Sequence, residues 1–174
     1  MLRLTFMAFA FGIRDLFRPP TKILQRVGIG PGMTVLDFGC GPGGFSIAAA
    51  MLTGQQGHVY ALDRDPVALR SVKTKADRKG LHNIETIGPE EIHLIADRSI
   101  DVVLLYDVLH ELDDIEPVLK DMRRVLKDQG VLSVDDHHLS DDVILSKVGT
   151  GGLFRCCGRI GRTIHFAPAN RSRG

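Results

Sequence analysis

The residues best suited to chemistry lie in a glycine-rich segment, where residues 39–44 read Gly-Cys-Gly-Pro-Gly-Gly after a short apolar stretch. A strand that enters such a turn and leaves it as a helix lets a ligand approach the backbone. Glycine has no Cβ, and the first N–H groups of a helix are free. Gly39, Gly41 and Gly44 fit the dinucleotide pattern G-x-G-x-x-G, and Gly39, Gly41 and Gly43 fit a tighter G-x-G-x-G. The glycines alone therefore leave the ligand open, and close packing of helix on strand remains an alternative.

Asp37, two residues before Gly39, favours one ligand class over the other. A carboxylate beside a pyrophosphate would repel it by several kcal/mol where screening is poor. A carboxylate beside a cationic or hydrogen-bond-donating ligand is favourable. S-adenosylmethionine carries a sulfonium and an ammonium group and no phosphate, so the sequence favours this ligand over a nicotinamide or flavin dinucleotide.

A second group of polar residues follows an apolar strand expected at 100–106. Tyr106 and Asp107 end that strand, and the carboxyl edge of an open α/β sheet is where ligands bind. His110 would accept a proton from a substrate hydroxyl or an acidic carbon, because its reference pKa lies near neutrality. A packing or capping role is the alternative for His110.

Residues 135–138, Asp-Asp-His-His, suggest a metal site after the next strand. Together with Asp107 they would offer oxygen ligands to Mg²⁺. Adjacent strand residues point to opposite faces, however, so at most half of these side chains converge. We therefore expect a polar strand end and no metal.

Helices and strands alternate along the chain and define the elements that must position these residues. The expected helices are 21–27, 44–52, 66–79, 90–96, 114–126 and 141–148, and the expected strands are 33–38, 58–62, 83–87, 100–106, 131–134, 153–157 and 163–167. The strand at 100–106 is apolar without alternation, as in a parallel sheet covered on both faces. A hairpin turn is expected at 158–161. The pattern predicts a doubly wound α/β fold with a mostly parallel seven-stranded sheet and an antiparallel C-terminal hairpin.

The motifs in this order resemble the class I S-adenosylmethionine-dependent methyltransferases, nearest to the ubiquinone/menaquinone-type small-molecule enzymes. The resemblance covers about residues 20–167 and rests on 35–43 (VLDFGCGPG), 59–63 (VYALD), 100–112 (IDVVLLYDVLHEL) and 125–132 (VLKDQGVL). It implies a Rossmann-like fold, S-adenosyl-L-methionine as cofactor, and methylation of a small, partly apolar molecule on O, C or N.

Two other functions stay open beside this one. The first is an RNA methyltransferase, since residues 42–46 (PGGFS) are similar to the RNA ribose enzymes, although no base-methylating motif follows the fourth strand. The second is a non-catalytic S-adenosylmethionine-binding or regulatory subunit with the same fold.

The resemblance also implies a role for each matched residue. Cofactor-binding positions are Asp37, Gly39, Cys40, Gly41, Gly43, Asp63, Arg64, Glu90, Tyr106 and Asp107. Asp37 would organise the turn near the methionine amino group, and Asp63 would accept both ribose hydroxyls, since one carboxylate offers two oxygens. The family's usual adenine-binding aspartate is replaced by Pro89, so Glu90 is expected to serve adenine while Arg64 covers its edge. His110 is the candidate catalytic residue.

Composition limits the class of protein. The 174 residues are 44% hydrophobic and 25% charged with net charge +1, which predicts one folded domain and excludes a global basic field for nucleic acid. The arginines of the C-terminal part are expected to lie on a solvated hairpin rather than on RNA. Three cysteines cannot form a paired framework, which favours a reducing, cytoplasmic compartment, and Cys156 and Cys157 are expected in the core.

Domain boundaries follow from the same patterns. No apolar run is long enough to span a bilayer. Residues 1–19 form an apolar segment that we expect to be a lid over the substrate or a homodimer interface, with a short signal peptide as the alternative. Residues 20–168 form the S-adenosylmethionine-binding domain, and residues 169–174 a frayed tail.

Overall fold

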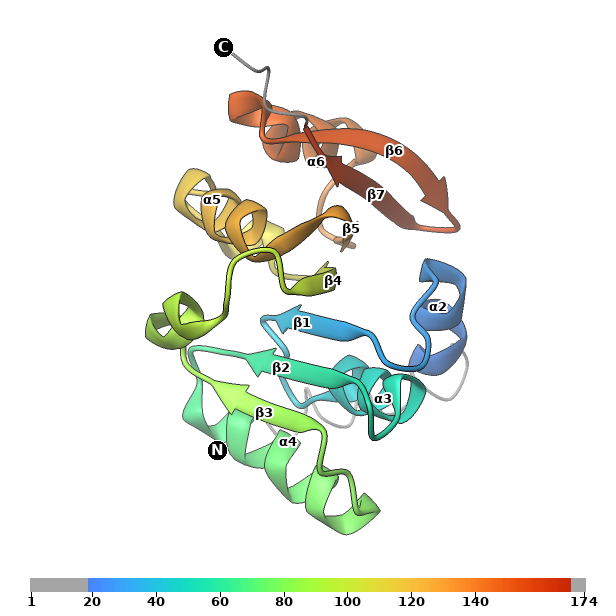
Figure 1. Cartoon of the computed structure of the whole chain (residues 1–174). Helices are drawn as coiled ribbons and strands as arrows, with labels where there is room; N and C mark the ends of the chain where they lie inside the picture. The colour runs from blue at the N-terminus through green and yellow to red at the C-terminus, as the bar shows by residue number, and fades with distance from the viewer. Residues whose placement is uncertain (1–18, 170–174) are drawn as a thin grey trace.

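The computed structural model describes residues 19–169, which form one seven-stranded sheet flanked by helices (Figure 1). The strand order is β3-β2-β1-β4-β5-β7-β6. The strands are β1 (Thr34–Phe38), β2 (His58–Leu62), β3 (Ile84–Ile87), β4 (Ile100–Tyr106), β5 (Leu126–Asp135), β6 (Phe154–Ile160) and β7 (Thr163–Pro168). β1 to β5 pair in parallel, whereas β7 is antiparallel to β5 and to β6. The predicted fold class is therefore confirmed.

Helices cover both faces of this sheet. They are α2 (Pro20–Val27), α3 (Gly44–Thr53), α4 (Pro66–Lys79), α5 (Glu116–Val125) and α6 (Asp141–Gly149), with the 3-10 helices η1 (Pro89–Leu94), η2 (Leu109–Glu111) and η3 (Thr150–Gly152). Local chemistry sets several of these ends. Asp65 caps α4 by accepting the N–H of Val67, and Gly80 ends that helix in the left-handed conformation.

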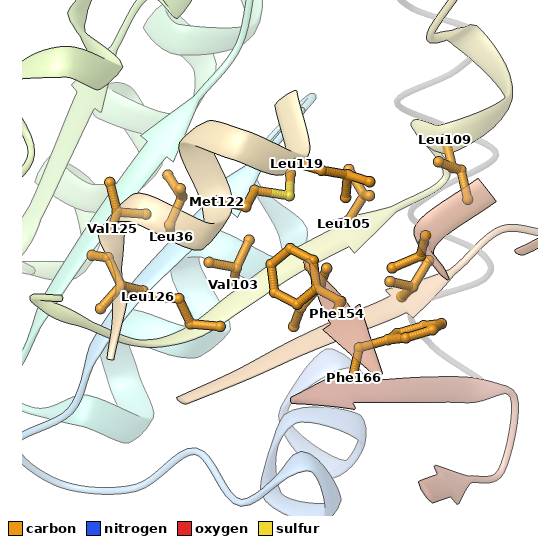
Figure 2. Packing of buried hydrophobic residues seen from close by; sticks show 14 of the residues in the cluster. Leu36, Val103, Leu105, Leu109, Leu119, Met122, Val125, Leu126, Phe154 and Phe166 are labelled. Carbon is orange, nitrogen blue, oxygen red and sulfur yellow. The ribbon is translucent and has the colours of Figure 1, made fainter. Parts of the chain in front are cut away.

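The core consists of two apolar layers, one on each face of the sheet. β4 contributes to both, because Val103 and Leu105 join the layer under α5 while Leu104 joins the layer under α2 and α3. Figure 2 shows the first layer, where Leu119 and Met122 of α5 pack near β4, and Phe154 and Phe166 extend the cluster toward the C-terminal hairpin. Burial on both faces explains why residues 100–106 are apolar without alternation.

The register brings the polar strand ends together. Asp37 of β1 lies opposite Ala61 of β2 and Leu104 of β4, and Tyr106 of β4 lies opposite Asp135 of β5. The residues that follow β1, β2, β4 and β5 therefore share the carboxyl edge of the sheet, next to the point where the strand order reverses.

Three details of the C-terminal half differ from expectation. β5 begins at Leu126, directly after α5, and not at residue 131. β6 continues to Ile160, so the hairpin turn is formed by residues 161–162. Cys156 and Cys157 are exposed, so their expected place in the core is wrong: β6 is an edge strand that no helix fully covers.

In residues 19–169, no helix has both the length and the apolarity that a membrane crossing requires.

Candidate functional site

The glycine turn after β1 is closed on two sides and open on the third. Gly39, Gly41 and Gly43 all have positive φ, at 76°, 49° and 87°. A Cβ at Gly39 would lie 2.3 Å from Cγ2 of Val108, and one at Gly43 would lie 2.6 Å from Cγ2 of Val72. A Cβ at Gly41 would meet nothing within 4 Å. Gly41 is therefore the position where a ligand can approach the backbone of the turn.

Neighbouring elements hold this turn in place. The N–H groups of Gly39 and Cys40 donate to the carbonyl of Leu62 at the end of β2, at 2.8 and 2.9 Å. From α4, Nζ of Lys75 donates to the carbonyl of Pro42 at 2.6 Å. The turn is thus fixed before any ligand binds, which reduces the ordering cost of binding.

Asp63 connects the end of β2 to the open part of the turn. Its Oδ2 accepts the N–H of Gly41 at 2.8 Å, and its Oδ1 accepts the N–H of Asp65 at 2.8 Å. A carboxylate oxygen has more than one acceptor position, so both oxygens can still bind hydroxyl donors. The carboxylate lies beside Gly41, and its role in ribose binding stays a prediction.

Asp37 lies beneath the turn and is only 3% exposed. The Oγ of Ser46 donates to its Oδ2 at 2.5 Å, which ties β1 to the first turn of α3. Burial raises the pKa of Asp37 to about 6, against the lowering effect of Ser46 and with a smaller raising effect from Asp63. Burial likewise raises the pKa of the Cys40 thiol, so this thiol stays neutral at pH 7.

Two predicted adenine-side residues lie at the ends of β2 and β3. A Cβ at Gly88 would come 2.5 Å from Oε1 of Glu90, so this carboxylate folds back over the end of β3. Oε2 of the next residue, Glu91, accepts the N–H of Gly88 at 2.7 Å. Arg64 donates to Oε2 of Glu111 at 2.9 Å, across the edge of the sheet toward η2.

The side chain of Tyr106 packs inside the fold. Its hydroxyl lies 2.8 Å from Oγ of Ser133, its ring meets Phe45 edge to face, and burial raises its pKa. The backbone of Tyr106 remains at the carboxyl edge of the sheet. The next residue, Asp107, has a φ of 55°, and its N–H donates to the carbonyl of Asp135 at 2.7 Å.

Two aspartate–histidine pairs cross between the loops that follow β4 and β5. Asp136, which is 1% exposed, has Oδ2 at 2.9 Å from Nδ1 of His110 and at 3.0 Å from its backbone nitrogen. Asp107 has Oδ1 at 2.5 Å from Nδ1 of His137 and at 3.1 Å from its backbone nitrogen. The ring of His138 lies 4.1 Å from the His110 ring and 3.8 Å from the His137 ring. Each loop therefore supplies the acid that holds the other loop's histidine.

The same contacts bear on the metal alternative. Asp107 and Asp136 are engaged by histidine Nδ1 atoms, and Asp135 faces Nε of Arg162 at 3.4 Å. In the part of the chain that the structure describes, no three His, Cys, Asp or Glu side chains are arranged to hold a metal ion.

A cavity of about 250 Å³ lies elsewhere, near the start of β4. It is lined by Asp97, Arg98, Lys120, Arg123, Arg124 and Leu153. Its cations already have partners: Arg98 and Arg123 both face Asp128, Arg124 pairs with Asp97, and Lys120 pairs with Glu116. We therefore place the candidate site at the carboxyl edge and not in this cavity.

Sequence reasoning missed the partner of His110 and the contact of Val108 with Gly39. Both depend on β4 lying between β1 and β5, which no local pattern in the sequence states. The sequence carried one signal for this pairing, because an aspartate and a histidine follow each of two consecutive apolar strands.

Comparison with known proteins identifies the family of this chain. Residues 29–151 match a family described as a methyltransferase domain. The demethylmenaquinone methyltransferase of Geobacillus stearothermophilus is 34% identical over 110 residues, which are 63% of this chain and 47% of that protein. Its counterpart in Listeria welshimeri is 35% identical over 128 residues, which are 73% of this chain and 53% of that protein. The chain spans about half the length of the curated relatives it matches.

A solved structure is similar over most of the chain. It is the crystal structure of a SAM-dependent methyltransferase from Aquifex aeolicus, with a TM-score of 0.73 and 25% identity. The match covers 86% of this chain and 87% of that one.

Proposed function

The chain belongs to the methyltransferase domain family, and on this premise we propose that it transfers a methyl group from S-adenosylmethionine to a small, partly apolar molecule. One observation carries the proposal. An open glycine turn, backed by the carboxylate of Asp63, lies at the same sheet edge as His110. The turn would hold the cofactor, and the loop after β4 would face the methyl acceptor.

The charges around the turn fit S-adenosylmethionine better than a dinucleotide. Asp37 and Asp63 place two carboxylates beside the turn, while Nζ of Lys75 is engaged by the carbonyl of Pro42. A pyrophosphate there would be repelled, whereas an ammonium and a sulfonium would be attracted. When bound, the cofactor supplies a methyl group and keeps the bonding electrons on sulfur, so the acceptor must give up one proton.

The cofactor would be held by residues at three strand ends. Asp63 would accept the ribose hydroxyls, and the backbone from Gly39 to Gly41 would face the methionine part. Glu90, which follows β3, would form a hydrogen bond with adenine. Arg64 would give up its hydrogen bond with Glu111 and cover the edge of the adenine ring. Asp107 and the backbone of Tyr106 would line the side toward the methyl acceptor.

His110 would accept the proton that the methyl acceptor releases. Alignment supplies much of the rate in such a displacement, and holding two reactants in geometry is worth ~7–11 kcal/mol. A general base adds a further factor of roughly 10²–10⁴. Since the relatives are named for demethylmenaquinone, we propose an aromatic hydroxyl compound of the quinol class as the acceptor.

The division of the chain also remains a proposal. Residues 20–168 would be the cofactor-binding domain. Residues 1–18 and 170–174 lie outside the described residues, so the expected lid or homodimer interface at the N-terminus and the expected tail at the C-terminus stay predictions.

The proposal is tested by binding and by transfer. Calorimetry of the full chain with S-adenosylhomocysteine and with NADH should give a complex with the first and none with the second. Incubation with methyl-labelled S-adenosylmethionine should transfer label to reduced 1,4-naphthoquinone and not to total RNA. Binding of NADH without S-adenosylhomocysteine would refute the cofactor, and label on RNA alone would favour the RNA methyltransferase.

A further inference from the structure

Asp136 is buried, and its carboxylate has three hydrogen-bond partners, which are two backbone N–H groups and one histidine ring nitrogen. It accepts from the backbone N–H of His110 and of His138, at 3.0 Å each, and lies 2.9 Å from Nδ1 of His110. We propose that Asp136 is the positioning residue that fixes the tautomer of His110, so that Nε2 is the proton acceptor in methyl transfer. This inference rests on the proposed function for the reaction, but its structural part can be tested alone.

The contacts determine where the proton of the imidazole lies. An ionised carboxylate only accepts hydrogen bonds, and Asp136 already accepts two backbone N–H groups. Nδ1 of His110 must therefore carry a hydrogen to satisfy the contact at 2.9 Å. In the neutral ring this leaves Nε2 with a free lone pair, which is the form that a general base needs.

Nε2 also lies on the side of the site where the proton would be released. It is 3.9 Å from Oε1 of Glu111, whose other oxygen binds Arg64 next to Asp63. The His110 side chain is 25% exposed, whereas that of Asp136 is fully buried. Asp136 therefore holds the ring from the buried side through Nδ1, which leaves Nε2 as the nitrogen for the methyl acceptor.

The chemistry gives this carboxylate a second role. The acceptor's hydroxyl hydrogen passes to Nε2 as a proton, and the oxygen–hydrogen electron pair stays with the acceptor to attack the methyl group. The imidazolium that forms carries a positive charge next to the negative charge of Asp136. Removing Asp136 would take away this negative charge as well as the partner that orients the ring.

The second aspartate–histidine pair provides an internal control. His137 is held by Asp107 in the same way, but its side chain is 51% exposed. If activity required only that these loops be held in place, breaking either aspartate–histidine contact would have a similar effect on activity. If His110 is the base, only the Asp136 pair affects proton transfer.

Nuclear magnetic resonance of the ¹⁵N-labelled full chain tests the structural part without any turnover. The long-range ¹⁵N–¹H pattern of neutral His110, assigned with the His110→Gln variant, should show the hydrogen on Nδ1. In Asp136→Asn the amide can donate to Nδ1, so the pattern should move toward hydrogen on Nε2. A wild-type ring with its hydrogen on Nε2 would overturn the proposal.

A double-mutant cycle tests the functional part with reduced 1,4-naphthoquinone as the acceptor. Asp136→Asn should lower kcat by about 100-fold or more and leave the affinity for S-adenosylhomocysteine unchanged. His110→Ala should have a similar effect, and the double variant should be no slower than His110→Ala. His137→Gln should keep near-normal kcat.

Additive losses in the double variant would show that Asp136 does not act through His110. A wild-type chain that binds no S-adenosylhomocysteine would defeat the proposed function instead, and the tautomer measurement would still decide the role of Asp136.

Discussion

Alanine at Gly39 and at Gly41 should have opposite consequences, although both glycines have positive φ in one turn. Either substitution places a side chain in the left-handed region, which costs about 1–2 kcal/mol. At Gly39 the new methyl group would also lie 2.3 Å from Cγ2 of Val108. Overpacking of this kind costs roughly 1–3 kcal/mol, so Gly39→Ala should lose about 2–5 kcal/mol of unfolding free energy.

Gly41→Ala should lose only the backbone part, because its methyl group would meet no atom of the protein within 4 Å. If the cofactor occupies that space, the methyl group would instead obstruct the ligand. We expect the unfolding free energy of Gly41→Ala to lie within about 2 kcal/mol of the wild-type value. This variant should bind S-adenosylhomocysteine at least tenfold more weakly than the wild type.

Urea unfolding measures the first quantity and titration calorimetry the second. Gly39→Ala combined with Val108→Ala is the matched control, since shortening Val108 removes the clash and should restore part of the lost free energy. Unchanged affinity in Gly41→Ala would refute the inference that a ligand approaches the turn at Gly41. Equal stability of the two single variants would refute the packing argument.

Four further predictions follow from the site. Asp63→Ala should weaken S-adenosylhomocysteine binding by about 1.5–3 kcal/mol per lost charge-assisted bond, measured by calorimetry, and unchanged affinity would reduce Asp63 to a turn residue. Because the pKa of Asp37 rises from 3.8 to about 6 on folding, its ionisation opposes folding. Relative to Asp37→Asn, the ligand-free wild type should therefore lose about 2 kcal/mol of unfolding free energy between pH 4 and 7, and parallel pH profiles would contradict the burial effect. Methyl transfer should persist in EDTA, and recovery only with Mg²⁺ would make the Asp107 region a metal site. Deleting residues 1–17 should keep the fold and cofactor affinity but abolish turnover; unfolding would make the segment part of the core, and a change from dimer to monomer in light scattering would make it an interface.

The sequence predicted the elements that local patterns define. The strand β4 and the strand–turn–helix around the glycines were predictable, because continuous burial and positive φ restrict residue type strongly. The ligand of the turn was left open by the glycines alone. The start of β5 was missed because α5 passes into the strand at Leu126 without a turn residue. The hairpin turn was misplaced because Gly158 lies in β6 at a shift of register and not in the turn.

The site was predictable only where one segment carries it. The turn and Asp63 follow from motifs, and the structure brings them together through the hydrogen bond between the Gly41 N–H and Asp63. The pairing of Asp136 with His110 joins residues 26 positions apart on two loops. Such a contact depends on which strands are neighbours, and the sequence does not state that order.

The exposed edge strand β6 has a consequence for how the protein behaves at high concentration. An edge with unpaired backbone groups invites another strand to extend the sheet, and native proteins interrupt such edges with charges and bulges. β6 has both: Arg155 and Arg159 lie along it, and its register with β7 shifts between Cys156 and Gly158. Arg159 is moreover held by Asp141 of α6. We expect the arginines and the shifted register of β6 to disfavour the joining of sheets between neighbouring molecules.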